Sequence, residues 1–268
     1  MIDLLSALLI VVLLCSSAGL GMFISPRLPP AHRARETVEM MTLVIGMLVT
    51  FAALVLGLIT ASVKRGYDDA VHYRQEYALL LTQLDRCLRN YGPGADAAHA
   101  YVRSYTAASI ASYWPSEPLP VGVQYPDTSG MHDLIITGEV PALADLMNHA
   151  GLEISRFNPT DASQTRIAEG CRQDYRDVLR ARLSMIETKN AGLSAPFYQI
   201  LVFWLMIIFA SFGLLAPRHS LSLISIALCA VSLSTAIFVI FDLSRPYDGL
   251  FAMSSAPMRT ALDSMLRP

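Results

Sequence analysis

Long apolar stretches without a single Asp, Glu, Lys or Arg occur four times along the chain, in two pairs. They are Leu4–Pro26, Met40–Val63, Asn190–Pro217 and His219–Phe241. Each exceeds the roughly 20 residues that an α-helix needs to cross the hydrocarbon core of a bilayer. A backbone in lipid must satisfy its own hydrogen bonds, so we expect helices there. The pattern predicts transmembrane helices at about 4–24, 40–63, 196–215 and 220–242, arranged as two hairpins.

The segment between the hairpins is polar and holds more Asp and Glu than Lys and Arg. Apolar positions recur every three or four residues in its first part, which predicts a helix that continues the second span. These positions are Tyr67, Ala70, Tyr77, Leu81, Leu84, Leu88 and Tyr91. Further helices are expected at about 96–114 with Asp96 as N-cap, at 140–150 with Gly151 after the helix, and at 163–189. No useful strand pattern appears.

The expected architecture is therefore an all-α integral membrane protein with an inserted helical soluble domain. Residues 1–65 and 194–243 form the hairpins, 66–193 the soluble domain, and 244–268 a C-terminal tail. The composition agrees, because 53% of the residues are hydrophobic and only 16% are charged, against about a quarter in soluble domains. The net charge of −2 gives no reason to expect a nucleic-acid partner. The expected surroundings are a lipid bilayer.

Small and polar residues follow one face of two spans. The second span has Gly46, Thr50, Ala53, Gly57 and Thr60, and the fourth has Ser222, Ser225, Cys229, Ser232 and Thr235. Membrane helices associate through such residues, so helix–helix packing is the favoured interpretation. The alternative is that one of these faces lines a water-filled path. A row of small residues does not decide between the two.

Ionisable chemistry at the membrane is limited to one acid, Asp242, at the end of the fourth span. An ionisable group beside lipid is a candidate functional residue. Arg245 follows three residues later, and a structural pair between the two is the favoured interpretation.

Motifs for catalysis and cofactor binding are missing from the sequence. There is no phosphate-binding glycine loop with lysine, no His-Glu-x-x-His and no Cys-x-x-Cys, and the six histidines lack metal-ligand spacing. We therefore expect no enzyme activity, no cofactor and no metal.

Two cysteines of the soluble domain stand at matching distances from the membrane. Cys87 follows the second span, and Cys171 precedes the third by a similar length of predicted helix. Antiparallel neighbouring helices would place the two thiols level, and a disulfide then needs Cα atoms within about 7 Å. The alternative, two unrelated buried thiols, stays open.

The orientation is argued from loop charge. With four spans, the termini and the soluble domain share one side, and the short loops with Arg27, Arg33, Arg35 and Arg218 share the other. The positive-inside rule slightly favours short loops in the cytoplasm and the domain outside, in the periplasm of a bacterial inner membrane. Lys64, Arg65 and Arg245 favour the opposite placement.

Several short motifs stand out along the chain. They are Leu84-Asp85-Arg86, Tyr91-Gly92-Pro93, Trp114-Pro115, Phe203-Trp204, the run from Phe209 to Arg218, and an acidic-x-x-x-Pro-aromatic-x-Gly signature in which Asp242, Arg245, Pro246, Tyr247 and Gly249 stand. Together these motifs resemble the bacterial bestrophin-like domain-of-unknown-function family of membrane proteins. Gly94 departs from the family, which commonly has an acid there.

The resemblance covers nearly the whole chain and implies a likeness to bestrophins, which are pentameric anion channels with a cytoplasmic soluble part. It therefore implies a homo-oligomer that conducts anions passively. The alternative function is a non-catalytic, membrane-anchored sensor or assembly protein that acts through its helical domain.

Overall fold

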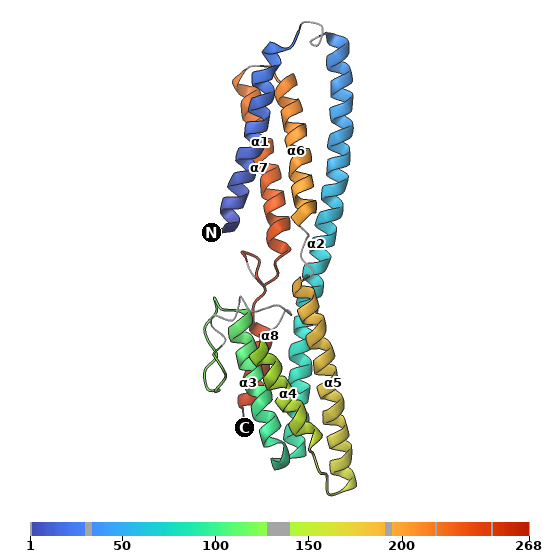
Figure 1. Ribbon diagram of the computed structural model, residues 1–268, viewed down its shortest axis with the longest axis vertical. Helices are drawn as coiled ribbons and strands as arrows, with labels where there is room; N and C mark the ends of the chain where they lie inside the picture. Colours follow the sequence, from blue (N-terminus) through green and yellow to red (C-terminus); the bar gives the residue numbers. More distant parts are fainter. Residues whose placement is uncertain are drawn as a thin grey trace. The chain divides into compact units, whose positions relative to one another are not determined.

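Helices joined by turns and loops make up the computed structural model of the chain (Figure 1). It describes residues 2–29, 34–127, 140–190, 195–217, 219–247 and 249–267, and these ranges contain no strand. The all-α class expected from the sequence is confirmed.

The longest stretch between consecutive helices runs from residue 114 to residue 140. In chain order the helices and turns are α1 (Ile2–Ile24), the 3-10 turn η1 (Ser25–Arg27), α2 (Arg35–Tyr91), the 3-10 turn η3 (Pro93–Ala95), α3 (Asp96–Tyr113), α4 (Pro141–Ser155), α5 (Ala162–Asn190), α6 (Ala195–Leu215), α7 (Ser220–Leu243) and α8 (Ala256–Leu266).

The chain divides into two compact units. Unit 1 consists of Met1–Tyr67, Gly192–Arg245 and Gly249–Phe251, and unit 2 of Asp68–Ala191, Pro246–Asp248 and Ala252–Pro268. The C-terminal tail, expected to be one region, contributes to both units.

One 57-residue helix, α2, supplies residues to both units. No proline interrupts it, and it ends where Gly92 adopts a φ of +94° and donates its N–H to the carbonyls of Leu88 and Arg89. That conformation favours glycine, so Gly92 explains why the helix stops at Tyr91.

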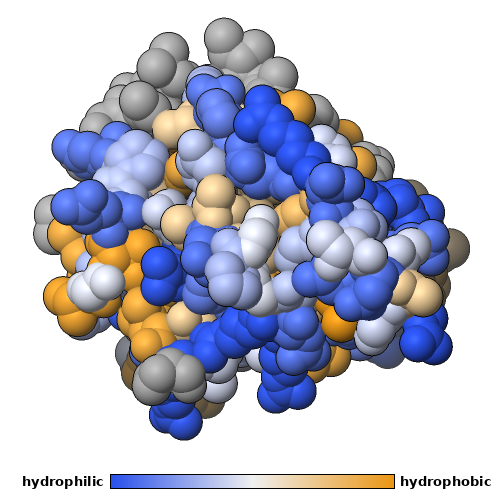
Figure 2. Space-filling model, turned by 90° about the horizontal axis from the view of Figure 1, so that it is seen from below, coloured by the Kyte–Doolittle hydropathy of each residue, from blue (hydrophilic) through white to orange (hydrophobic). Residues whose placement is uncertain are grey.

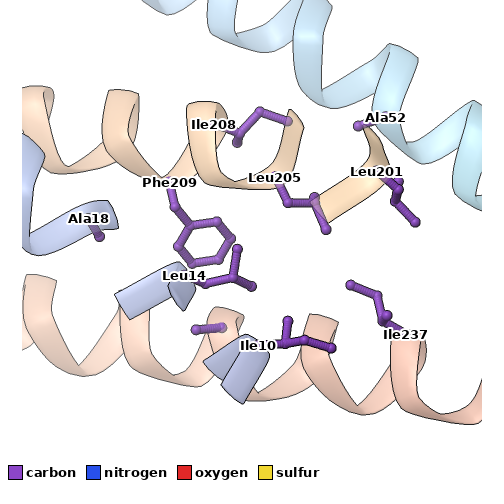
Figure 3. Packing of buried hydrophobic residues seen from close by; sticks show 10 residues of the cluster. Ile10, Leu14, Ala18, Ala52, Leu201, Leu205, Ile208, Phe209 and Ile237 are labelled. Carbon is purple, nitrogen blue, oxygen red and sulfur yellow. The ribbon is translucent and has the colours of Figure 1, made fainter. Parts of the chain in front are cut away.

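In unit 1, α1 packs against both α6 and α7 (Figure 1). Figure 3 shows Phe209 of α6 pointing toward Leu14 of α1. The buried cluster around them is Ile10, Leu14, Ala18, Ala52, Leu201, Leu205, Ile208, Phe209, Ala230 and Ile237. Such interdigitated side chains give the unit a close-packed core.

Glycines let the backbones of α1 and α6 touch. A Cβ added at Gly21 would overlap the Ala210 carbonyl, and one at Gly213 would overlap the Ala18 carbonyl. Close backbone approach through small residues is typical of helix pairs in membranes. The Ser17 hydroxyl strengthens this pair by donating to the Met206 carbonyl at 2.6 Å.

In unit 2, the polar part of α2 packs with α3. The hydroxyl of Tyr77 donates to the hydroxyl of Tyr105 at 2.7 Å, and both side chains are buried. Desolvation raises the pKa of Tyr77 well above its ordinary value, and Tyr105 adds to the effect.

Cys87 of α2 and Cys171 of α5 are joined by a disulfide, with their Cα atoms 5.4 Å apart. The face in Figure 2 is mostly hydrophilic, with apolar residues in separate patches.

Two local expectations were wrong. Asp96 is the first residue of α3 rather than its N-cap, because the 3-10 turn Pro93–Ala95 leads directly into the helix and Ala95 takes the cap position. Gly151 lies inside α4 rather than after it. The hydroxyl of Tyr175 occupies the space beside Gly151 and donates to the Met147 carbonyl, so the glycine makes room for a neighbouring helix.

The tail contains a helix for which no prediction was made. Residues Ala256–Leu266 form α8, with Pro257 in the first turn. The buried residues Met258, Ala261, Leu262 and Met265 have helical spacing. Arg89 fixes the helix end by donating to the carbonyls of Ser264 and Arg267.

Candidate functional site

The small-residue face of α2 is not covered by the part of the chain that the structure describes. Thr50 and Gly57 are exposed, and so are Gly46, Ala53 and Thr60. A Cβ added at Gly46 or Gly57 would meet no atom within 4 Å. The Thr50 hydroxyl donates to the Gly46 carbonyl at 2.9 Å, so its hydrogen is satisfied while its oxygen can still accept.

The predicted row on α7 also faces outward. Ser225 and Ser232 are exposed, whereas Ala230, Ser234 and Ile237 are the buried α7 residues that face the core. The Ser234 hydroxyl donates to the Ala7 carbonyl of α1 at 2.7 Å. Helix packing within the chain therefore uses a different face of α7 from the one that the spacing indicated.

Asp242 closes the turn that follows α7. Its carboxylate is buried and accepts the backbone N–H of Leu250 at 3.0 Å and that of Phe251 at 2.8 Å. The hydroxyl of Tyr67 donates to the Phe251 carbonyl at 3.1 Å and holds the same segment against α2. Asp242 therefore stabilises the turn after α7 in unit 1.

Gly249 makes this closure possible. Its φ is +106°, in the region that favours glycine, and an added Cβ would overlap the Asp242 carboxylate. Arg245 donates its backbone N–H to the Asp242 carbonyl at 3.0 Å, and its guanidinium lies 4.3 Å from the centre of the Phe241 ring. The two residues thus meet through the backbone.

Pro246 and Tyr247 belong to unit 2 and are both buried there. The Tyr247 ring lies 5.8 Å from that of Trp114, whose indole N–H donates to the Met253 carbonyl at 2.6 Å. Met253 donates its own N–H back to the Pro246 carbonyl at 2.8 Å. Burial raises the pKa of Tyr247 to about 12, against a smaller lowering effect from Arg74.

Glu117 anchors the start of α8. It accepts hydrogen bonds from the backbone N–H and the hydroxyl of Ser255, and it pairs with Arg259 at 3.1 Å. Burial raises the pKa of the Glu117 carboxyl, but the hydrogen bonds from Ser255 and Arg259 outweigh it and hold the pKa below its ordinary value. Sequence reasoning missed this cluster because its members lie about 140 residues apart.

The signature residues and the small-residue faces are thus different kinds of feature. Asp242, Arg245 and Gly249 shape one turn of unit 1, and Pro246 is buried in unit 2, whereas the outward faces of α2 and α7 remain available to other molecules. Within the ranges described, no group of three His, Cys, Asp or Glu side chains converges as a metal site would require.

Comparison of the chain with models of known protein families identifies the family to which it belongs. The family model of the bestrophin-like domain matches residues 12–258, nearly the entire chain. The chain belongs to the bestrophin-like family. This bestrophin-like protein also resembles solved structures of a bacterial bestrophin homolog from Klebsiella pneumoniae along its whole length.

One variant of that homolog has a TM-score of 0.67 at 13% identity, with 97% of this chain and 98% of that chain covered. A second variant has a TM-score of 0.69 at 12% identity, with 98% and 96% covered. A structure described as a membrane protein has a TM-score of 0.67 at 12% identity, with 97% of both chains covered. At this identity the likeness concerns the fold. No curated protein matches the chain in sequence.

Proposed function

We propose that this bestrophin-like protein is a multi-pass homo-oligomer that conducts anions passively across a bacterial inner membrane. Family membership supports the proposal, since anion conduction is the activity that the resemblance to bestrophins implies. The observation that carries it is the exposed small-residue face of α2, which this chain alone leaves open.

Four spans are proposed for each copy. By length and composition, Ala7–Arg27, the apolar part of Arg35–Tyr91, and Ser220–Leu243 can each cross a bilayer. The apolar helix Gln199–Leu215 is shorter, but it lies within α6 and packs along α1. Because α1 can cross the bilayer and α6 lies along it, we assign the fourth span to α6.

The arrangement of α2 supports assembly around an axis. Beside its small face lies a flank of large exposed side chains, including Leu43 at 72% and Met47 at 75% exposure. Exposing such apolar area to water costs about 25 cal/mol per Å², so lipid or another copy must cover it. We place this flank against a neighbouring copy and the face with Thr50 and Gly57 toward a shared lumen.

Conductance of the purified protein in planar bilayers tests the proposal. Gly57→Leu should narrow the lumen and lower the single-channel conductance, and Thr50→Val should change it by removing a hydroxyl. Met47→Leu is the matched control, since it keeps an apolar side chain on the flank beside the small face. A folded oligomer that stays electrically silent would refute conduction and favour the alternative, a membrane-anchored sensor or assembly protein.

We also infer that unit 2 lies in the periplasm. The disulfide between Cys87 and Cys171 supports this placement, because disulfides persist in oxidising compartments. It is opposite to the placement that the bestrophin resemblance implies. Alkaline phosphatase fused after residue 268 should be active in intact cells, whereas an inactive fusion paired with an active cytoplasmic reporter would reverse the orientation.

A further inference from the structure

Two apolar cavities of unit 1 meet at a single polar residue, His219. One, of about 450 Å³, lies between α1 and α7 and is lined by Met22, Phe23, His219, Ser220 and Leu223. The other, of about 430 Å³, lies between α6 and α7, and its lining includes Phe209, Phe212, His219, Leu221 and Ser225. Both are open grooves at the surface of the unit rather than enclosed cavities, with volumes in the range of small-molecule sites.

The shared end of the cavities offers hydrogen-bond donors. His219 is the N-cap of α7, and its Nδ1 accepts the backbone N–H of Ser222 at 3.3 Å. In the neutral ring this leaves the proton on Nε2, which lies 3.4 Å from the Ser222 hydroxyl oxygen and can also donate to a ligand. The first turn of α7 also presents the positive end of a helix dipole, where anions are favoured.

A permanent cation lies near the same end. The guanidinium of Arg27 lies 3.7 Å from the centre of the Phe23 ring, and Phe23 lines the first cavity. The walls away from this end are largely apolar. The site therefore combines one anion-attracting end with two separate apolar compartments.

We propose that this site binds one anionic phospholipid, with its phosphate at His219 and the first turn of α7 and one acyl chain in each cavity. A diacyl lipid has this branched shape, whereas a packed helix of a second copy would need one continuous groove. Exposed apolar residues of α7, among them Leu221 and Leu228, place the cavities on a surface that lipid can reach. The inference uses the membrane placement of unit 1 and does not depend on conduction.

Three variants of the full chain separate the parts of this site. His219→Asp keeps a good N-cap for α7 but repels a phosphate. Ser225→Phe fills the cavity between α6 and α7. Val231→Phe is the control, since Val231 is exposed on α7 and lines neither cavity.

Native mass spectrometry of the purified protein in detergent measures the binding, with dioleoyl phosphatidylglycerol, dioleoyl phosphatidylcholine or inorganic phosphate added separately. We expect the anionic lipid to bind at least about tenfold more tightly than phosphatidylcholine. His219→Asp and Ser225→Phe should each weaken its binding about tenfold, while Val231→Phe should not. The Tm of His219→Asp should match that of the wild type.

Three outcomes would overturn the proposal. They are equal binding of the two lipids in every variant, binding of inorganic phosphate as tight as that of the lipid, and a Ser225→Phe variant that changes the oligomer mass instead of lipid binding. The last would identify the cavity as a contact between copies. None of these readouts involves conductance, so failure here and failure of the proposed function are distinguishable.

Discussion

Asp242 and Gly249 depend on each other. The carboxylate can reach the N–H groups of Leu250 and Phe251 only because the glycine turns the chain with a positive φ and leaves no Cβ in the way. A buried carboxylate without such donors would be costly. The family signature around these residues is therefore explained at this position by turn geometry rather than by catalysis.

Gly249→Ala should lower the free energy of unfolding by at least about 2 kcal/mol, because it adds backbone strain and displaces the Asp242 carboxylate. Thermal unfolding in detergent, followed by circular dichroism, measures the effect. Gly66→Ala is the control, since Gly66 lies inside α2 with no atom within 4 Å of an added Cβ. It should be neutral or stabilising by up to about 1 kcal/mol, and equal losses in both variants would contradict the account.

Acid should weaken the anchoring of α8. Because the pKa of Glu117 is lower in the folded protein than its ordinary value of 4.5, its contribution to stability is present above that value. The contribution is lost as the pH falls through the lowered pKa. Unfolding measured from pH 7 to pH 3 should show this acid-dependent loss, and Glu117→Gln should remove it. An identical pH profile for both proteins would exclude the role given to Glu117.

At the scale of elements, α1 and α6 pack through glycine. Gly213→Ala would press a methyl group into the Ala18 carbonyl and force the helices apart, and we expect a loss of about 1–3 kcal/mol in unfolding free energy. Gly19→Ala is the matched control in α1, since an added Cβ there meets nothing within 4 Å. Chemical unfolding in mixed micelles compares the two. A harmless Gly213→Ala would show that α1 and α6 are not held this closely.

The disulfide ties α2 to α5 across 84 residues of sequence. Closing a loop of this length lowers the entropy of the unfolded chain, which stabilises the folded state by roughly 4.5 kcal/mol in the chain-entropy model. Reduction, or a Cys87→Ser/Cys171→Ser double variant, should therefore lower the stability of unit 2 by an amount of that order. Proteolysis kinetics with and without reductant measure it, and unchanged kinetics would show that the bond does not form in the isolated protein.

Sequence patterns predicted the helices well where one physical requirement dominates. Freedom from charge over more than 20 residues located α1, α6 and α7, and the lack of any break beyond Val63 gave the continuous α2. The spacing of Met258, Ala261 and Met265 carried a signal for α8 that was overlooked. The same spacing logic could have found it.

Contacts between distant segments could not be predicted. The closure of the turn by Asp242, the pairing of Glu117 with Ser255 and the meeting of two cavities at His219 depend on how the helices pack. Helical spacing also cannot tell which of two small-residue faces is buried, as Ser234 and Ser232 on α7 show. Tertiary packing decided each of these cases.

At the scale of the whole molecule, a single copy leaves its most distinctive surface uncovered. The α2 face with Thr50 and Gly57 carries the small residues through which membrane helices associate, and its apolar flank is unsuited to water. In an assembly of several copies, the apolar flank is buried between neighbouring copies, and the small-residue face lines the axis around which the copies are arranged.

The reversal potential of the purified protein in a planar bilayer tests this account most directly. With a tenfold KCl gradient, an anion-conducting oligomer should give currents that reverse near the chloride equilibrium potential. Gly57→Leu should reduce these currents without changing the oligomer mass. A stable oligomer with no current, or with reversal near the potassium potential, would contradict the account.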